Sequence, residues 1–260
     1  MNLDKSPRSA GAGPGTDTDT VDADEVERFA RAAAAWWDPE GAFGPLHRLN
    51  PVRIGFIRDR LLRHFGRDPQ ALSPFSGLSL LDIGCGGGLV AEPMARLGFA
   101  VTAIDADANA LEVARAHAAA TGLAIDYRAA AVEDLGTGAG FDAVLALEVV
   151  EHVRAPQVFL GAAARLVRPG GALIAATINR TARSFLLAII GAEHVLRWVP
   201  RGTHRWEKFL RPAELAAGLR AGGLVPHAVC GLVYVPGRGW VLASDLSTNF
   251  LLIAIKPKQK

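Results

Sequence analysis

The chain has 260 residues, half of them hydrophobic, with 28 basic and 26 acidic side chains. This length suits one α/β domain of ordinary size with some additions. The net charge of +2 is too small, and the basic residues too scattered, to indicate nucleic-acid binding. Because the only cysteines are Cys85 and Cys230, a disulfide framework is not expected and a reducing, cytoplasmic compartment is the natural one.

The N-terminal part divides into a tail and a helical segment. Residues 1–20 are rich in Gly, Ser, Thr, Asp and Pro without the apolar core of a secretory signal, so we expect a disordered tail. Residues 21–260 are expected to form a single domain. Within it, residues 21–66 contribute two N-terminal helices, over Glu25–Trp37 and Val52–Phe65.

From Ser79 onward, apolar runs of strand length alternate with helical patterns. The expected elements are strands at Ser79–Ile83, Ala100–Ile104, Ala124–Tyr127, Phe141–Leu145 and Ala172–Ile178, and helices at Leu89–Leu97, Ala108–Ala120 and Pro156–Val167. This alternation predicts an α/β fold with a mostly parallel sheet. Two further strands, Val225–Val233 and Asn249–Ile255, predict a C-terminal hairpin across Pro236–Gly239, which would add one antiparallel strand and complete a seven-stranded sheet.

The first strand runs directly into a glycine loop, Leu80-Leu81-Asp82-Ile83-Gly84-Cys85-Gly86-Gly87-Gly88. Glycine tolerates positive φ and, having no Cβ, lets a ligand touch the main chain, so the loop indicates a nucleotide-like ligand. The loop has no G-K-[ST] and therefore is no phosphate-binding P-loop; Leu89 occupies the sixth position, so it also lacks a clear dinucleotide fingerprint.

Asp105 ends the second strand, 21 positions after Gly84, where a carboxylate accepts hydrogen bonds from ribose hydroxyls. Nicotinamide enzymes and methyltransferases both use such an acid. Asp82 before the glycines, including Gly86, and the C-terminal hairpin resemble class I methyltransferases that use S-adenosyl-L-methionine. The resemblance implies a Rossmann-like fold and that cofactor. Residues 132–134 are then expected near its adenine, although an exposed acidic turn is an equal alternative.

Three longer segments resemble a narrower family, the ubiquinone-biosynthesis O-methyltransferases, over nearly the whole chain from about Val26. The segments are Trp36–Gly41 with Pro45–Arg53, Glu148–Val153, and Gly191–Arg197 followed by Val199–His204. The resemblance implies methyl transfer to phenolic hydroxyls of polyprenylated precursors, a 2-polyprenyl-6-hydroxyphenol and 3-demethylubiquinol. The cofactor-contacting positions of the family match Arg53, Gly84, Asp105 and Leu147. A guanidinium at Arg53 suits bidentate binding of the methionine carboxylate; taken alone, it would be read as a packing or surface arginine.

Glu148, Glu151 and His152 follow the fourth strand, at the sheet edge where α/β proteins bind ligands. Their spacing places them on one side of a helical turn. Three readings stay open. The three side chains bind Mg²⁺, which orients the acceptor oxygens; His152 is a metal-free general base; or the segment is a capped turn with solvated acids.

Residues 180–204 form a long insert, in which 183–201 are apolar and bounded by arginines. The insert is too short and too charged to span a bilayer. It suits either an interfacial helix or an ordinary amphipathic helix covering the active site. With a lipid-tailed acceptor, the resemblance favours peripheral contact with the inner face of the cytoplasmic membrane, and it admits contact with other ubiquinone-biosynthesis enzymes.

Two alternative functions remain beside this reading. A methyltransferase acting on another small, soluble catechol or phenol would leave the apolar insert unexplained. A cofactor-binding module without turnover would bind the cofactor tightly and transfer no methyl group, yet the motifs show no sign of degradation. The glycine pattern disfavours a dehydrogenase.

Overall fold

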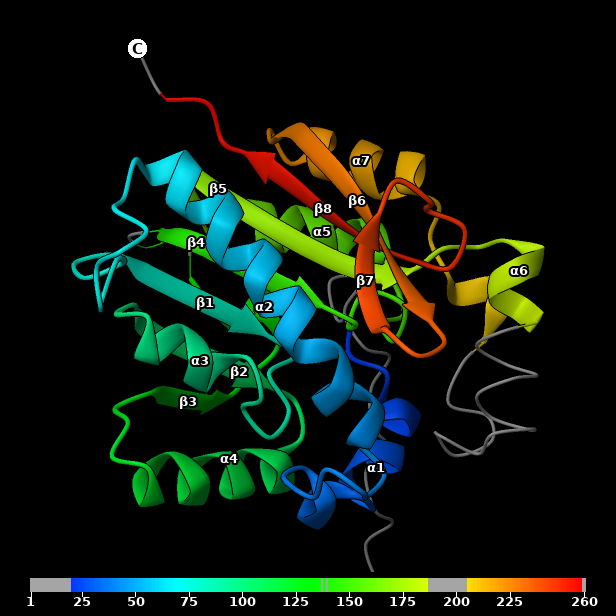
Figure 1. The fold of residues 1–260 in the computed structure, drawn as a ribbon, viewed down its shortest axis with the longest axis horizontal. Helices are drawn as coiled ribbons and strands as arrows, with labels where there is room; N and C mark the ends of the chain where they lie inside the picture. The colour runs from blue at the N-terminus through cyan, green and yellow to red at the C-terminus, as the bar shows by residue number, and fades with distance from the viewer. Residues whose placement is uncertain (1–19, 137, 139, 187–204, 259–260) are drawn as a thin grey trace, which may run out of the picture.

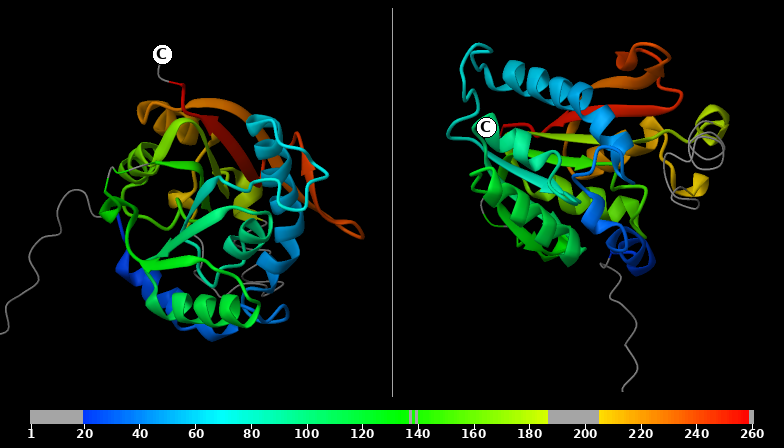
Figure 2. Two further views of the ribbon diagram at one scale, coloured as in Figure 1. Left: turned by 90° about the vertical axis from the view of Figure 1, so that its left-hand side faces the viewer. Right: turned by 60° about the horizontal axis from the view of Figure 1, so that its bottom comes forward.

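A computed structural model describes residues 20–136, 138, 140–186 and 205–258. Its centre is one eight-stranded sheet with helices on both sides (Figures 1 and 2). In spatial order the strands are β3 (Asp126–Ala129), β2 (Ala100–Asp105), β1 (Ser79–Ile83), β4 (Phe141–Leu147), β5 (Val167–Ile178), β8 (Asn249–Ile255), β6 (Val225–Val235) and β7 (Gly239–Ala243). The direction of the chain across the sheet reverses between β1 and β4, which is where open α/β sheets bind ligands.

The helical elements lie before, between and after the strands. In chain order they are α1 (Ala23–Ala30), η1 (Ala33–Ala35), α2 (Gly44–Phe65), α3 (Ala91–Arg96), α4 (Ala108–Ala120), η2 (Val132–Asp134), α5 (Pro156–Arg165), α6 (Ala182–Ser184), η4 (Trp206–Lys208) and α7 (Pro212–Ala221). None of the helices in the described part of the chain is both long and apolar enough to cross a bilayer.

Two apolar layers fix the helices to the sheet. Consecutive residues of a strand point to opposite faces, so Leu80 packs in the layer of α2, α3 and α4 while Leu81 packs in the layer of α5 and α7. Both side chains are completely buried. The predicted α/β architecture with a mostly parallel sheet is confirmed.

The C-terminal part of the sheet differs from the prediction. The sheet has eight strands rather than seven, because the turn at residues 236–239 joins β6 to an additional strand, β7, and not to β8. Both β7 and β8 run antiparallel to their neighbours. The edge strand is supported by a cross-strand pair, Tyr234 and Trp240, whose ring centroids lie 5.8 Å apart. No pattern in the short run Gly239–Ala243 announces this pairing.

The N-terminal helices also differ in length from the prediction. The first ends at Ala30 instead of Trp37. The second begins at Gly44, eight residues before the expected start, and carries Pro51 inside it. Asn50, next to that proline, is buried, and its amide donates to the carbonyl of Leu89 at 3.2 Å, a tertiary contact that favours the longer helix.

Two predicted segments lie largely outside the described residues. Only Thr20 of the expected tail is described, and of the insert 180–204 only residues 180–186 are.

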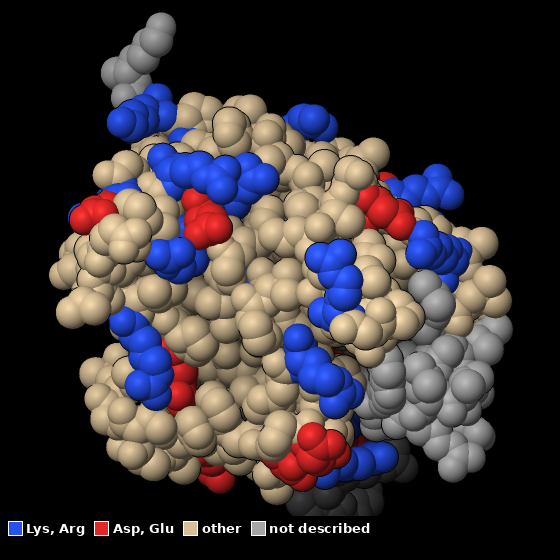
Figure 3. All heavy atoms as spheres, in the orientation of Figure 1, with Lys and Arg blue, Asp and Glu red and all other residues tan. Residues whose placement is uncertain are grey.

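On the face viewed in Figure 1, the Lys and Arg side chains are mostly separated by uncharged surface (Figure 3).

Gly231 of β6 tests the pairing at this end of the sheet. A Cβ there would overlap the backbone carbonyl oxygen of Asp245. We expect Gly231→Ala to lower the free energy of unfolding by about 2 kcal/mol or more, measured by urea denaturation. Gly55→Ala is the control, because open space surrounds Gly55 in α2 and alanine there should stabilise by about 0.5–1 kcal/mol. Unchanged stability of the Gly231 variant would contradict the described course of the 243–249 loop.

Candidate active site

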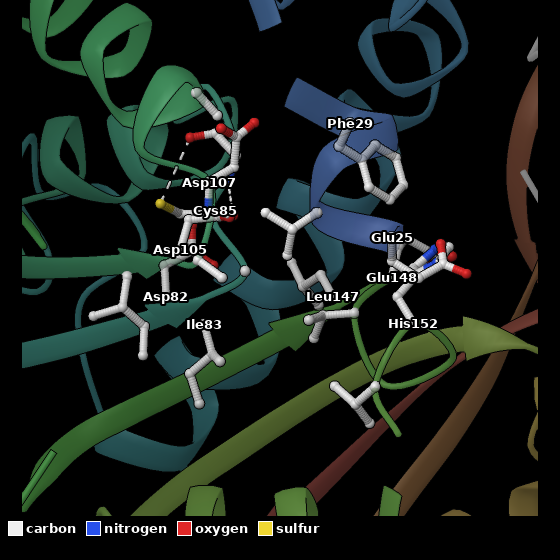
Figure 4. A pocket seen from close by; sticks show the side chains of 18 of the residues that line it. Glu25, Phe29, Asp82, Ile83, Cys85, Asp105, Asp107, Leu147, Glu148 and His152 are labelled. Carbon is white, nitrogen blue, oxygen red and sulfur yellow. Dashed lines mark hydrogen bonds and ion pairs between the residues drawn. The ribbon is translucent and has the colours of Figure 1, made fainter. Parts of the chain in front are cut away.

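A cavity of about 300 Å³ lies at the carboxyl ends of β1, β2 and β4. The segment from Thr20 to Leu46 lines its outer side, with residues that include Glu25, Phe29 and Trp36. All eight predicted site residues line this one cavity: Arg53, Gly84, Gly86, Asp105, Leu147, Glu148, Glu151 and His152. Figure 4 shows Asp105, Leu147, Glu148 and His152 around the cavity, together with Asp82 and Ile83 of β1 and Glu25 and Phe29 of α1. Topology therefore brings together residues up to a hundred positions apart.

The glycine loop is held closed by the end of β2. The amides of Gly84 and Cys85 donate to the carbonyl of Ile104 at 2.9 and 3.0 Å, and the amide of Gly86 donates to Oδ2 of Asp105 at 2.7 Å. Gly86 has a φ of 51°, in the left-handed region that favours glycine. The carboxylate of Asp105 thus holds the glycine loop in place through a direct hydrogen bond.

Two tryptophans from the N-terminal segment cover the outside of this loop. Trp36 stacks on Phe43 with ring centroids 3.7 Å apart, and a Cβ at Gly86 would overlap its indole. Trp37 donates from Nε1 to the carbonyl of Gly87 at 2.9 Å and stacks on His117 at 3.4 Å. The loop therefore needs glycine on its outer face as well, for close packing against the N-terminal segment.

Arg53 reaches the cavity from α2 and is only 3% exposed. Its Nε lies 3.1 Å from Oδ1 of Asn50, to which Nη2 also donates, and Nη1 lies 4.0 Å from Oε1 of Glu148. Burial lowers the pKa of the guanidinium, whereas the charges of Glu148, Asp82 and Glu151 raise it. Since arginine stays protonated in proteins, this is a buried cation surrounded by three carboxyl groups.

Asp82 is a buried carboxyl group without a hydrogen-bond partner on one of its oxygens among the described residues. Burial raises its pKa to about 7, with Arg53 opposing the rise and Asp105 adding to it. Two more cavity-lining residues have a buried polar atom with no such partner, Asp107 at Oδ2 and Trp36 at Nε1. Unsatisfied buried polar atoms are rare in proteins, so this cavity fits a ligand with several polar groups.

Glu148 follows β4 with a φ of 53°, the one positive value for a residue other than glycine in the described ranges. Such a conformation costs about 1–3 kcal/mol and is concentrated at functional sites. Nδ2 of Asn249 lies 3.3 Å from Oε1 of this carboxylate. Glu151 is buried and accepts from Oγ1 of Thr177 at 2.9 Å. Burial and the neighbouring Glu148 raise the pKa of Glu151 well above its ordinary value.

His152 points towards the N-terminal helix instead of its two acidic neighbours. Its Nδ1 lies 3.1 Å from Oε2 of Glu25. Its ring is perpendicular to that of Phe29, with the ring centroids 5.1 Å apart (Figure 4). The sequence-based prediction missed Glu25, Phe29 and Asn249. Glu25 and Phe29 lie one helical turn apart on α1, but no local signal indicates that this face meets a residue more than 120 positions away.

Of the three predicted metal ligands, Glu148 and Glu151 contact each other, but His152 points away from them to Glu25. Glu151 bonds to Thr177, His152 to Glu25, and Glu148 to Asn249. Across residues 20–136, 138, 140–186 and 205–258, no three His, Cys, Asp or Glu side chains gather closely enough to hold a metal ion. The arrangement described here therefore does not fit the Mg²⁺ set that the resemblance implies.

Comparisons with known proteins show which proteins this chain resembles. A family model described as a methyltransferase domain matches residues 81–175. The ubiquinone biosynthesis O-methyltransferase of Azorhizobium caulinodans is 50% identical over 92% of this chain and 95% of its own length. That of a Chelativorans species is 51% identical, over 94% of this chain and 97% of its own.

Solved structures are similar at the level of fold. The magnesium protoporphyrin IX methyltransferase of Synechocystis has a TM-score of 0.58 at 18% identity, covering 90% of this chain and 93% of that one. The N-methyltransferase of Bradyrhizobium japonicum, solved with S-adenosyl-L-homocysteine, has a TM-score of 0.58 at 16% identity, covering 90% and 99%.

The raised pKa of Asp82 predicts a pH dependence of stability. Between its ordinary value of 3.8 and about 7, the folded state binds this proton more tightly than the unfolded chain does. The associated stability is fully present below about 3.8 and is lost as pH rises through 7. Relative to Asp82→Asn, the ligand-free wild type should lose up to about 1 kcal/mol of unfolding free energy per pH unit between pH 5 and 7.

Urea denaturation at half-unit pH steps measures this difference. Asp59→Asn is the matched control, since Asp59 lies on α2 with an exposed side chain. Parallel pH profiles for wild type and Asp82→Asn would contradict the assigned environment of Asp82.

Proposed function

The chain belongs to the family of ubiquinone biosynthesis O-methyltransferases, and from this premise we propose its reaction and the residues that carry it. The enzyme transfers a methyl group from S-adenosyl-L-methionine to phenolic hydroxyls of polyprenylated ubiquinone precursors. The acceptors are a 2-polyprenyl-6-hydroxyphenol and 3-demethylubiquinol.

One observation supports this assignment above the others. The glycine loop, Asp105 and Arg53 line the same cavity as Glu148 and His152. Residues suited to hold a charged nucleoside-like cofactor thus share one space with residues suited to handle a phenolic proton. Methyl transfer requires the acceptor oxygen, methyl carbon and sulfur to be aligned with water excluded.

The residues around the cavity match the polar groups of the cofactor. Arg53 is a buried cation suited to the methionine carboxylate, and Asp105 has acceptor capacity left for ribose hydroxyls. The backbone of Gly84 and Gly86 allows close approach, and Leu147 contributes an apolar contact next to them. The cofactor itself supplies a methyl group activated by its positively charged sulfur.

His152 is proposed as the catalytic residue, acting as general base on the phenolic hydroxyl. It lines the cavity, and its side chain is 16% exposed. Its Nδ1 faces Glu25, which leaves Nε2 for the acceptor. A base of this type contributes about 10²–10⁴-fold to a rate. Glu148 and Glu151 lie next to Arg53 and are assigned to positioning, with no step through a metal.

The acceptor carries an isoprenoid tail, so the enzyme must meet a membrane surface. We assign that contact to residues 183–201, of which only 183–186 are described. At their start Phe185 and Leu186 are 41% and 57% exposed. Exposed apolar side chains beside Arg183, whose guanidinium is also exposed, suit the interface of an anionic bilayer.

The direct test of the proposed reaction is transfer of a labelled methyl group from S-adenosyl-L-methionine to short-chain 3-demethylubiquinol. The same assay with a soluble catechol, and with chelator or added Mg²⁺, separates the acceptor classes and measures any metal dependence. Transfer to the quinol several-fold faster than to the soluble catechol is expected. No transfer to the quinol would overturn the proposal.

His152→Ala should lower kcat by about 10²–10⁴-fold while the affinity for S-adenosyl-L-homocysteine, measured by calorimetry, stays within about twofold of the wild type. The reason is that the imidazole handles the acceptor proton and does not hold the cofactor. His227→Ala is the control, because His227 lies exposed on β6, away from the cavity. A near-normal kcat in His152→Ala would exclude the catalytic role.

Membrane contact is tested by flotation with vesicles containing anionic lipid. We expect the wild type to float and Phe185→Ser/Leu186→Ser to float several-fold less, because two exposed apolar anchors are removed. Leu72→Ser controls for surface hydrophobicity in general. Leu72 is 96% exposed and precedes β1, on the side of the sheet where the parallel strands begin, whereas Phe185 and Leu186 follow the end of β5. If the wild type stays with the unbound fraction, the assigned contact is wrong.

A further inference from the structure

Glu25 is a buried acid for which cofactor binding gives no reason. It is 5% exposed and lies on α1, a helix that precedes the sheet. Oε2 of Glu25 lies 3.1 Å from Nδ1 of His152, and Figure 4 shows both side chains at the same end of the cavity. Burying a carboxylate is costly unless hydrogen bonds and charges compensate it, so this placement calls for an explanation.

The charges around the pair come from three elements. Arg28 on α1 lies 2.9 Å from Oε2 of Glu25, and Lys208 of η4 lies 3.5 Å from Oε1. Glu151 precedes His152 on its own segment and bonds elsewhere, to Thr177. Burial would raise the pKa of Glu25, but the hydrogen bond and charge of His152 and the charges of Arg28 and Lys208 lower it below its ordinary value. With an arginine at 2.9 Å and a lysine at 3.5 Å from its two oxygens, Glu25 is an ionised acceptor.

An ionised carboxylate has no proton to donate. The hydrogen bond at 3.1 Å therefore requires Nδ1 of His152 to be the donor. A neutral imidazole carries one proton on its two nitrogens, so Nε2 then holds the lone pair. Phe29, perpendicular to the imidazole with centroids 5.1 Å apart, restricts rotation of the ring.

We propose that Glu25 is the positioning residue of His152: it selects the Nδ1–H tautomer and holds the ring so that Nε2 faces the acceptor hydroxyl. The inference rests on the proposed methyl transfer, in which Nε2 takes the phenolic proton as the oxygen forms its bond to the methyl carbon and the carbon–sulfur bond breaks. The N-terminal helix thus contributes to the chemistry as well as covering the cavity.

A purely structural role, anchoring α1, has other residues to fulfil it. Lys208 also lies 2.8 Å from Asp22, the backbone amide of Arg154 donates to Thr20 at 2.9 Å, and the hydroxyl of Thr20 donates to Glu133 at 2.7 Å. None of these three contacts involves Glu25. Glu25→Gln preserves the shape of the side chain and removes only its charge, so the two roles are separable.

Nitrogen NMR of protein labelled at histidine tests the tautomer without any substrate. At alkaline pH, where the imidazoles are neutral, the wild type should show the Nδ1–H form for His152, assigned by its loss in His152→Ala. Glu25→Ala should abolish that preference, because a free imidazole has no fixed acceptor. Glu27→Gln is the control, since Glu27 lies exposed on the same helix and pairs with Arg31. An unchanged tautomer in Glu25→Ala overturns the proposal.

Kinetics provide the second measurement. Glu25→Gln should lower kcat about tenfold or more, with KM for the cofactor and the calorimetric affinity for S-adenosyl-L-homocysteine within about twofold of the wild type. Glu25→Asp should recover part of the loss because it keeps the carboxylate. A rise in KM at constant kcat would mean a structural role and contradict positioning. If the wild type itself transfers no methyl group, the proposed function fails, while the NMR result still decides the role of Glu25.

Discussion

The site depends on one buried cation. Arg53 places a guanidinium from α2 among Asp82 of β1 and Glu148 and Glu151 beyond β4. A buried charge is tolerated only when opposite charges and hydrogen bonds surround it, and removing one partner of such a set costs about 3–5 kcal/mol. This requirement couples helix α2 to the carboxyl edge of the sheet, and it therefore fixes the position of the cavity between them.

The same electrostatic balance accounts for the unusual groups around Arg53. Glu148 adopts a left-handed backbone that few side chains adopt, and its carboxylate is held between Arg53 and Asn249. Asp82 keeps a pKa near 7 because burial outweighs the attraction of the guanidinium. A positively charged ligand in the cavity would favour the ionised form of Asp82. The ligand-free site therefore lacks a positive charge beside Asp82 and an anion beside Arg53, and the cofactor proposed here carries positively charged groups as well as a carboxylate.

Much of the cofactor half of this site follows from local sequence. The glycine loop and the acid 21 positions later encode a contact, Gly86 to Asp105, that the structure contains, because strand–loop–helix units are specified within a few dozen residues. The helix Ala108–Ala120 has the predicted limits for the same reason. The acceptor half was less predictable. His152 turns to Glu25 and Glu148 turns to Asn249, through contacts that no local pattern encodes. Tertiary burial likewise extends α2 through Pro51.

Two parts of the chain thus line one cavity. The carboxyl edge of the sheet supplies the glycine loop and the residues after β4, and the N-terminal helices α2 and α1 supply Arg53 and Glu25. We propose that Arg53 holds the carboxylate of the cofactor through its planar, bidentate guanidinium. Calorimetric binding of S-adenosyl-L-homocysteine to Arg53→Lys tests it most directly, because lysine keeps the charge and loses the fork. With Arg58→Lys on the exposed side of α2 as control, we expect a loss of affinity of about tenfold or more for Arg53→Lys alone. Equal affinity in the wild type and Arg53→Lys, with unchanged circular dichroism, would contradict it.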